Sequence, residues 1–346
     1  MLFKKPLEVK LSITGRCNYS CDFCFNRNLS QSPKELSARD ARKTIKGIAD
    51  AGIEKVRFTG GEPLLRPDIF GLMEYAKRLG LFVMLNTNGS LLGEKTVSRL
   101  RACCDDILVS LNAANASDEA RLSGRKGKGL FAAKLSGLKA LSQESLFVRA
   151  STILSRRNIQ KLQEFPGLAD SLSVKQWLLL RPIPNPGMPF PLDSAGVENA
   201  VEAIISINRG KKEKTLIENA IPFCSYEPKK VSAVALGAIH EDGNSSLAVD
   251  ASGTIRPSYF IDLALGSALK GEFIAAWEHA FMQRLHSLEF IDEPCHKCIY
   301  LHKCRGGSRF SALFSNRSLY APDPLANPSK FQKKLFLPGR PCRNDL

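Results

Sequence analysis

The sequence has no uninterrupted apolar run of the roughly 18 residues that a membrane-spanning helix needs. Residues 1–14, MLFKKPLEVKLSIT, also lack an apolar stretch of signal-peptide length. The chain contains no internal repeat and no low-complexity tract. We therefore expect a globular protein of the cytosol that has no membrane partner.

The basic stretches of the chain lack interleaved aromatic residues. Residues 124–129 (GRKGKG) and 209–214 (RGKKEK) are examples, and this pattern is more typical of solvated surface charge than of a nucleic-acid groove. The overall balance is nevertheless basic, with 49 Lys plus Arg against 34 Asp plus Glu and a formal charge of +15. Such a charge attracts an acidic peptide or a polycarboxylate, whereas we do not expect a nucleic acid as partner.

Strand-like and helical segments alternate from residue 8 to about residue 180. Residues 8–14 have the period-two apolar pattern of a strand, and residues 37–52 predict a helix that begins at Ser37 and ends at Gly52. Further strands are expected at 54–60, 81–89, 105–113, 146–154 and 174–180, and further helices at 67–80, 94–104, 129–144 and 158–172. Six or so β-α units in series predict an α/β fold with a parallel sheet, whose chemistry lies at the carboxyl ends of the strands.

The regular alternation ends at a proline-rich segment, residues 181–193 (RPIPNPGMPFPLD). One more helix is expected at 194–208, and residues 246–259 predict a hairpin with Gly253 at its turn. We therefore predict two domains, residues 1–214 and residues 215–346. The 44% hydrophobic composition is sufficient for a large core with a smaller domain appended.

Most of the ten cysteines fall into two groups. One group is Cys17, Cys21 and Cys24, and the other is Cys295, Cys298 and Cys304. In a reducing compartment, clustered thiols indicate metal binding or catalysis more often than disulfides. The remaining cysteines are scattered, and we expect two of them, Cys103 and Cys104, to be core residues.

The first group supplies three ligands where a closed structural metal site needs four. Three thiolates on a loop after the first strand can hold three corners of a [4Fe-4S] cube and leave one iron open. An open metal position is one where chemistry can occur. Spacing alone equally allows a zinc site with a distant fourth ligand, or cysteines that bind no metal.

A second motif, residues 60–63 (GGEP), follows the second predicted strand. Two glycines allow close approach to the backbone, and a carboxylate suits a cationic amine. Together with the spacing CxxxCxΦC, in which Phe23 is the aromatic residue, this motif resembles the radical S-adenosylmethionine (SAM) superfamily over residues 8–180. The resemblance implies a partial (β/α)6 barrel core followed by a smaller cysteine-rich α+β domain.

The resemblance also implies roles for the first two motifs. Cys17, Cys21 and Cys24 would ligate a [4Fe-4S] cluster, and the amino and carboxylate groups of SAM would occupy its open iron. The methionyl amino group would be received by the GGEP motif, that is by Gly60, Gly61, Glu62 and Pro63, and Phe23 would border the adenine.

Residues at the ends of the later strands complete the SAM site that the resemblance implies. Ser110 and Asn112 would bind the ribose hydroxyls, although the family often has aspartate at the position of Asn112. Asn86 and Asn88 would face SAM or substrate, or would serve only the turn at Gly89. Ser151 is expected at the same mouth of the barrel.

The chemistry implied by the family is reductive cleavage of SAM. An electron from the cluster breaks the S–C5′ bond and yields methionine and a 5′-deoxyadenosyl radical, which abstracts a hydrogen from the substrate. We therefore expect an oxidoreductase that receives electrons from a reductase such as flavodoxin or ferredoxin.

The second cysteine group has the spacing Cx2Cx5C and is followed by Arg305, Gly306 and Gly307. It resembles the SPASM or twitch extension, which holds one or two auxiliary iron-sulfur clusters. Ser258 and Ser308 stand where a full SPASM domain has cysteines, so we expect one auxiliary [4Fe-4S] cluster on Cys295, Cys298 and Cys304. Cys342 is the expected fourth ligand, and the alternatives are Cys224, an open iron, or zinc in place of the cluster.

Within this family we expect oxidative modification or cross-linking of a peptide or protein. A step of cofactor or tetrapyrrole synthesis is the alternative, and a non-catalytic iron-sulfur electron carrier or scaffold is the alternative of another class. Because the predicted core begins near residue 8, we expect no peptide-recognition domain before it, and a separate leader-binding protein is compatible with this arrangement. Asp193, Asp242 and Asp250 are equally consistent with the general base of an oxidation.

Overall fold

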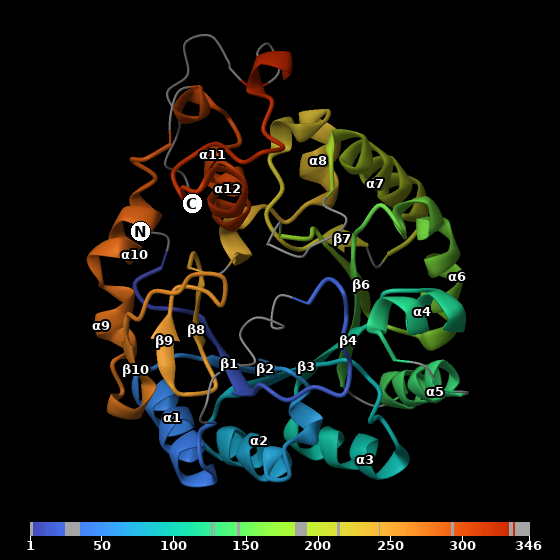
Figure 1. The fold of residues 1–346 in the computed structure, drawn as a ribbon, viewed down its shortest axis with the longest axis vertical. Coiled ribbons are helices and arrows are strands. Elements are labelled where there is room, and N and C mark those ends of the chain that lie inside the picture. Colours follow the sequence, from blue (N-terminus) through green and yellow to red (C-terminus); the bar gives the residue numbers. More distant parts are fainter. Residues whose placement is uncertain are drawn as a thin grey trace.

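The computed structural model describes residues 3–24, 35–125, 127, 129–143, 146–183, 192–212, 215–241, 243–291, 294–331 and 335 of the chain. Ten strands within these ranges form one sheet in the order β10-β9-β8-β1-β2-β3-β4-β5-β6-β7. Figure 1 shows the strands curving through the middle of the molecule with helices along the outside of the curve.

The central six strands are parallel neighbours in chain order. They are β1 (Glu8–Thr14), β2 (Lys55–Gly60), β3 (Phe82–Thr87), β4 (Asp106–Ser110), β5 (Phe147–Ile153) and β6 (Gln176–Leu180). Because their carboxyl ends meet at one edge, the residues after each strand converge there. The predicted α/β class with a partial barrel is confirmed.

The connecting helices cover the outer face of this barrel. They are α1 (Ala38–Asp50), α2 (Ile69–Arg78), α3 (Glu94–Cys103), α5 (Leu130–Ser142), α6 (Phe165–Leu172) and α7 (Ser194–Ile207). The predicted boundaries of α1 are confirmed, since the Ser37 side chain accepts a hydrogen bond from the Asp40 amide and Gly52 has φ +67°. The helix expected at 158–172 is instead a 3-10 turn, Ile159–Glu164, followed by α6.

One helix of the barrel, α4 (Ala116–Ser123), was not expected from the sequence. Asn115 caps its first turn and Gly124, at φ 64°, ends it. The segment offers little apolar periodicity, because Leu122 is its only large apolar residue. Its two caps were the signal that could have revealed it.

The chain after residue 214 extends the same sheet at both edges. On one side β7 (Leu216–Ile217) pairs parallel to β6, and on the other β8 (Ser246–Val249) pairs parallel to β1. The predicted hairpin is confirmed, because β9 (Thr254–Arg256) returns antiparallel to β8 with Gly253 at φ +90°, and β10 (Gly266–Ser267) follows. The division between residues 214 and 215 stays a prediction.

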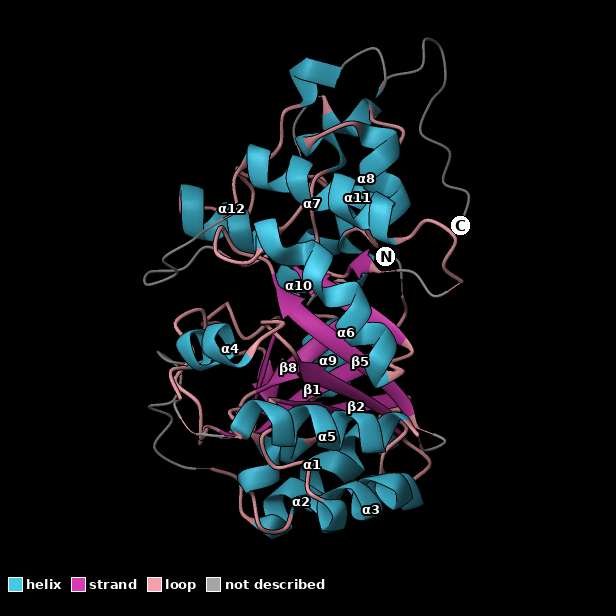
Figure 2. Cartoon of the chain, turned by 90° about the vertical axis from the view of Figure 1, so that its right-hand side faces the viewer, coloured by secondary structure: helices cyan, strands magenta, loops and turns pink. Residues whose placement is uncertain are grey.

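Short helices make up most of the remaining C-terminal structure. They are α8 (Pro228–Val234), α9 (Phe273–Trp277), α10 (Ala280–Ser287), α11 (Leu301–Cys304) and α12 (Arg309–Asn316). Figure 2 shows α11 and α12 on the opposite side of the sheet from α1, α2 and α3. In the described ranges, no helix combines the length and the apolar character that crossing a membrane requires.

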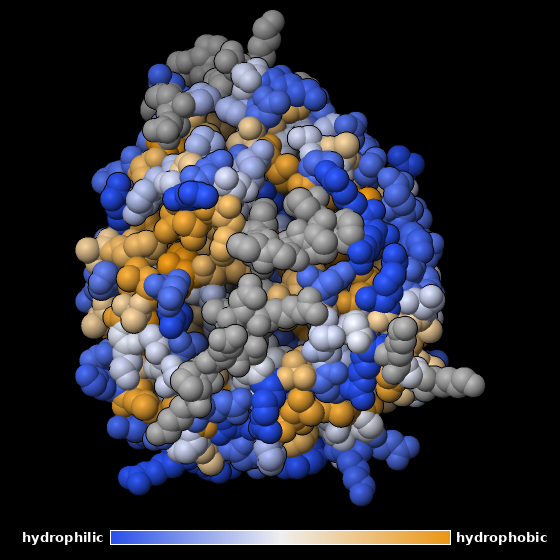
Figure 3. All heavy atoms as spheres, viewed as in Figure 1, coloured by the Kyte–Doolittle hydropathy of each residue, from blue (hydrophilic) through white to orange (hydrophobic). Residues whose placement is uncertain are grey.

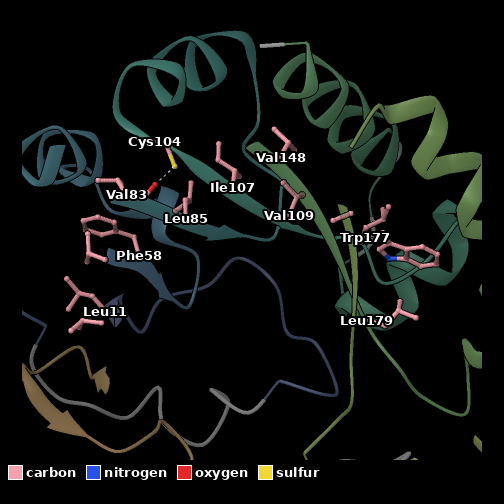
Figure 4. Packing of buried hydrophobic residues seen from close by; sticks show 14 of the residues in the cluster. Leu11, Phe58, Val83, Leu85, Cys104, Ile107, Val109, Val148, Trp177 and Leu179 are labelled. Atoms are coloured by element: carbon pink, nitrogen blue, oxygen red, sulfur yellow. Dashed lines mark hydrogen bonds between the residues drawn. The ribbon is translucent and has the colours of Figure 1, made fainter. Parts of the chain in front are cut away.

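Apolar side chains of neighbouring strands fill the space under the outer helices. Leu11, Phe58, Leu85 and Ile107 come from four successive strands and are completely buried (Figure 4). Cys103 and Cys104 are buried in the same cluster, as expected. This core fixes the strand ends from which the site is built.

Candidate active site and cysteine centres

The first three cysteines lie on the loop that follows β1. Cys17 is exposed, whereas Cys21 and Cys24 are half-buried. The Tyr19 amide donates a hydrogen bond to the Cys17 sulfur at 3.4 Å. Burial and the neighbouring Cys24 and Cys17 thiolates raise the pKa of Cys21 to about 12. The three sulfurs are therefore close enough to interact, and a bound cation would favour their thiolate forms.

The loop is tied to several neighbouring elements. The Ser20 amide donates to the carbonyl oxygen of Ser123 at 2.9 Å, which joins the loop to α4. Arg157, after β5, donates to Asp22 at 2.7 Å. Figure 1 shows the loop reaching inside the curve of the strands. These contacts hold the cysteines at the carboxyl end of the barrel.

Gly60 and Gly61 permit a close approach of this loop to the end of β2. A Cβ atom on Gly60 would lie 2.3 Å from the Thr14 carbonyl oxygen, and one on Gly61 would lie 2.0 Å from the Arg16 carbonyl oxygen. The Gly61 amide donates to the Thr14 carbonyl at 2.8 Å. The backbone that approaches both glycines is thus the chain's own cysteine loop.

Glu62 is completely buried, and its carboxylate accepts three hydrogen bonds from the chain. The donors are the Leu64 amide at 3.1 Å, the Thr87 hydroxyl at 2.9 Å and the Asn88 amide at 2.7 Å. Burial raises the pKa of Glu62. Glu62 therefore fastens the end of β2 to the end of β3, while Pro63 is buried at the start of the following 3-10 turn.

Asn88 and Asn86 lie in different surroundings. The Asn88 amide group donates to Asn18 at 2.8 Å and lies 3.9 Å from the Cys17 sulfur, and its oxygen accepts from the Ser90 amide. Asn88 therefore both supports the turn and lies close to the first group of cysteines. Asn86 accepts a hydrogen bond from Arg57 at 3.2 Å, inside the barrel.

The residues predicted to bind the ribose lie on the next two strands. Ser110 pairs with Ser151 in the register of β4 and β5. Asn112 and Ser151 are buried, and the Asn112 side-chain oxygen accepts from the Ile153 amide at 2.9 Å. The structure thus brings these residues to the same end of the barrel as the cysteine loop, and their contacts with SAM stay predictions.

A cavity of about 450 Å³ runs along the inside of the barrel. Phe23 of the cysteine loop lines it, and so do Phe260 and Phe310 from the C-terminal part of the chain. The basic residues of its wall are Lys10, Lys55, Arg57, Arg149 and Arg181, and the acidic ones are Glu8, Glu218 and Glu241. Its volume lies in the range of small-molecule and side-chain binding sites.

Ion pairs hold several of these wall residues in place. Arg57 contacts Glu8 at 2.6 Å, and although burial opposes ionisation, Arg57 lowers the pKa of Glu8 to about 2. Arg149 pairs with Asp106 at 2.8 Å. The wall is therefore a fixed array of charges rather than a set of mobile side chains.

Glu241 is a cavity residue that the sequence did not single out. Its Oε2 accepts from the Arg309 amide at 3.4 Å, and its Oε1 has no hydrogen-bond partner within the part of the chain that the structure describes. Burial raises the pKa of Glu241 to about 7. Of the carboxylates considered from sequence, Asp193 caps α7, Asp250 serves the β8–β9 turn, and Asp242 lies outside the described residues.

The C-terminal cysteines line a second, small cavity. Cys295, Cys298 and Cys304 meet there with Cys224, which lies on the 3-10 turn Phe223–Ser225. Burial raises the pKa of both Cys224 and Cys304 to about 12. Cys342, the fourth ligand expected from sequence, lies outside the described residues.

Ser258 and Ser308, which replace family cysteines, are completely buried. The Ser308 hydroxyl caps α12 by accepting from the Ser311 amide, and the Ser258 hydroxyl accepts from the Phe260 amide at 3.2 Å. The Ser308 side chain also hydrogen-bonds the carboxylate of Glu241, a residue of the main cavity.

The family model described as the radical SAM superfamily matches residues 11–165. Among curated proteins, the chain is 26% identical to the AdoMet-dependent heme synthase of Methanosarcina barkeri, over 87% of this chain and 90% of the relative. It is also 26% identical to the PqqA peptide cyclase of Rhodopseudomonas palustris, over 96% of this chain and 90% of the relative.

Two solved structures have similar folds. SuiB of Streptococcus suis bound to S-adenosylmethionine superposes with a TM-score of 0.76 at 17% identity, covering 94% of this chain and 78% of the neighbour. The enzyme anSMEcpe with bound AdoMet gives a TM-score of 0.68 at 17% identity, covering 88% of this chain and 90% of the neighbour. At these identities the likeness is one of fold.

Proposed function

The chain is a radical SAM enzyme, and we propose that it oxidatively modifies or cross-links a peptide or protein substrate. The observation that carries this proposal is the charged cavity that extends from Phe23 on the cysteine loop to Phe260 and Phe310 in the C-terminal part. Residues of the cysteine loop and of the C-terminal part therefore border one cavity, and a substrate side chain in it would contact both parts of the chain.

The residues of the first loop fit a SAM-binding [4Fe-4S] cluster. Cys17, Cys21 and Cys24 would hold it, because their three soft sulfur donors sit on one short loop anchored by the neighbouring strands. When bound, the cluster and SAM supply the reductive S–C5′ cleavage that generates a hydrogen-abstracting radical. The chain's own task is to hold these groups, orient the substrate and exclude water.

Several side chains are suited to that positioning role. Glu62 locks the ends of β2 and β3 together, and Gly60, Gly61 and Glu62 remain our candidates for receiving the amino group of SAM. Phe23 belongs to the cysteine loop and lines the cavity. Asn88 approaches the Cys17 sulfur and can orient it. Ser110, Asn112 and Ser151 remain our candidates for the ribose.

The relatives support a peptide substrate. The PqqA peptide cyclase aligns with nearly the whole chain, and the mycofactocin maturase MftC of Mycobacterium ulcerans is 26% identical over 92% of it. The formal charge of +15 on the whole chain attracts an acidic peptide. A separate leader-binding protein and a reductase of the flavodoxin or ferredoxin type would complete the system.

A carboxylated tetrapyrrole is the second candidate substrate. The similarity to the AdoMet-dependent heme synthase covers most of both chains. The same overall positive charge would attract the carboxylates of such a molecule. This alternative keeps the radical chemistry and changes only what fills the cavity.

The experiment that tests the proposal begins with SAM cleavage by anaerobically reconstituted protein and dithionite. We expect 5′-deoxyadenosine from the parent and at least 100-fold less from a Cys17→Ala/Cys21→Ala/Cys24→Ala variant, because the loop then has no ligand for the cluster. A Cys103→Ser variant, which changes a core thiol, controls for the loss of a cysteine. Equal yields of 5′-deoxyadenosine from the parent and the triple variant would contradict enzymatic cleavage of SAM and favour a non-catalytic iron-sulfur carrier.

The substrate class is tested by adding a library of acidic peptides or a tetracarboxylate porphyrin to the same reaction. Peptide modification predicts a 2 Da mass loss in a peptide, since net oxidation removes two hydrogens (about 1 Da each). A modified porphyrin with unmodified peptides would replace our first candidate by the second.

A further inference from the structure

We infer that Cys224 supplies the fourth thiolate to a [4Fe-4S] cluster held by Cys295, Cys298 and Cys304. This inference rests on the proposed function, in which an auxiliary cluster in the C-terminal part of the chain would accept an electron from the oxidised substrate. It assigns a ligand from the segment between β7 and α8, far from the Cx2Cx5C motif in sequence.

The first support is the position of the Cys224 side chain. It lines the same small cavity as the other three cysteines and is 8% exposed. It belongs to a buried cluster with Phe331 and Leu335, against which Cys298 also packs. Ala326 lines the cavity as well but carries no ligating atom. Among the described residues that line this cavity, Cys224 therefore supplies a fourth sulfur beside those of Cys295, Cys298 and Cys304.

The second support is the set of amide groups directed at the sulfurs. The Asn327 amide donates to Cys224, the Phe223 amide donates to Cys304, and the Tyr300 amide lies 3.5 Å from the Cys298 sulfur. Such N–H···S hydrogen bonds favour the thiolate form and are among the contacts that tune iron-sulfur clusters. By contrast, the core thiol of Cys103 acts as a donor, to the Arg99 carbonyl at 3.2 Å.

The four sulfurs do not converge on one point suited to a single metal ion. Among the described residues, no three His, Cys, Asp or Glu side chains stand close enough to hold one metal ion. A zinc ion would draw four sulfurs to about 2.3 Å from one centre. In a [4Fe-4S] cluster each thiolate binds a separate iron, so the ligands stand farther apart.

The test uses the full-length chain carrying Cys17→Ala/Cys21→Ala/Cys24→Ala, so that only the C-terminal centre can bind iron. After anaerobic reconstitution with iron and sulfide, we expect about four irons per chain. Adding Cys224→Ser should remove at least half of this iron and change the EPR spectrum of the dithionite-reduced protein. Adding Cys342→Ser, or Cys103→Ser as a matched control, should leave both unchanged.

A further variant separates ligation from folding. Cys224→Asp places a ligating oxygen in a buried apolar site, so it should retain iron with an altered EPR spectrum if residue 224 is a ligand. Loss of iron in Cys342→Ser with retention in Cys224→Ser would overturn the inference. Retention of iron with an unchanged EPR spectrum in all the variants would overturn it too, as would zinc in place of iron.

The proposed function is tested separately. It is measured as SAM cleavage by the parent chain, in which Cys17, Cys21 and Cys24 are intact. Absence of SAM cleavage in the parent itself would refute the proposed function while leaving the iron counts on Cys224 interpretable.

Discussion

At the scale of single residues, the most informative side chain is one that sequence patterns did not reveal. Glu241 is 5% exposed and lines the main cavity. Its importance depends on residues distant in sequence, such as Arg309, that meet it only after folding. Cys17, Cys21 and Cys24 could be grouped as candidate ligands because their spacing is local, whereas Cys224, an alternative ligand from sequence, meets the other C-terminal cysteines only in the folded chain.

Glu241 predicts a pH dependence of stability. Its pKa is raised from 4.5 to about 7, so between these values the folded state binds more protons than the unfolded chain. The free energy of unfolding should therefore fall by about 3 kcal/mol as the pH rises through this window. Glu241→Gln should remove that fall, as measured by anaerobic urea unfolding at pH 5 and pH 8.

The matched control for this prediction is Glu218→Gln. Glu218 lines the same cavity, but its side chain is 25% exposed. This variant should show the same difference between pH 5 and pH 8 as the parent. If the free energy of unfolding of the parent changed no more between pH 5 and pH 8 than that of Glu241→Gln, the raised pKa of Glu241 would be contradicted.

At the scale of elements, the sequence predicted the six barrel strands and most of their helices, because these segments carry a local apolar period. It did not reveal β7, whose two residues are too few to show a period. It also did not reveal that β8 pairs with β1, because pairing between distant strands leaves no local pattern. The hairpin itself was predictable from Gly253 and the alternation around it.

The contact between β2 and the cysteine loop makes Gly61 sensitive to any side chain. A Cβ there would meet the Arg16 carbonyl at 2.0 Å, so Gly61→Ala must displace the loop. We expect a loss of about 1–3 kcal/mol in the free energy of unfolding, as for other overpacked sites. Iron bound by the first loop should fall as well, measured by iron counts after reconstitution.

Gly93→Ala is the matched substitution for this element. Gly93 has φ −83°, and no atom lies within 4 Å of its added Cβ. The free energy of unfolding and the iron content of the Gly93→Ala variant should stay close to those of the parent. If Gly61→Ala behaved like Gly93→Ala, the close approach would not be what holds the loop.

At the scale of the whole molecule, one buried ion pair joins the barrel to the C-terminal segment. Arg181, directly after β6, donates to Asp323 at 2.6 and 2.8 Å, and the Ser308 amide donates to Asp323 at 2.7 Å. Both partners are almost completely buried. Figure 3 shows a patch of apolar residues on the left of the face viewed, among mostly hydrophilic ones.

Breaking this pair should destabilise the molecule strongly. Asp323→Ala leaves the Arg181 charge buried without its partner, which typically costs about 3–5 kcal/mol. Asp262→Asn provides the comparison, because Asp262 pairs with Arg256 while 96% exposed and should change stability by at most about 1 kcal/mol. Urea unfolding of both variants measures the difference, and equal effects would refute a role for the buried pair.

The pairing of β8 with β1 has a consequence for the order in which the molecule assembles. Glu8 lies opposite Ser246, so the outer edge of the first strand finds its partner only after most of the chain has left the ribosome. Until then, the barrel strands that have formed present an open edge to other nascent chains. The completion of the sheet is therefore a late, non-local event, and we expect it to be slow.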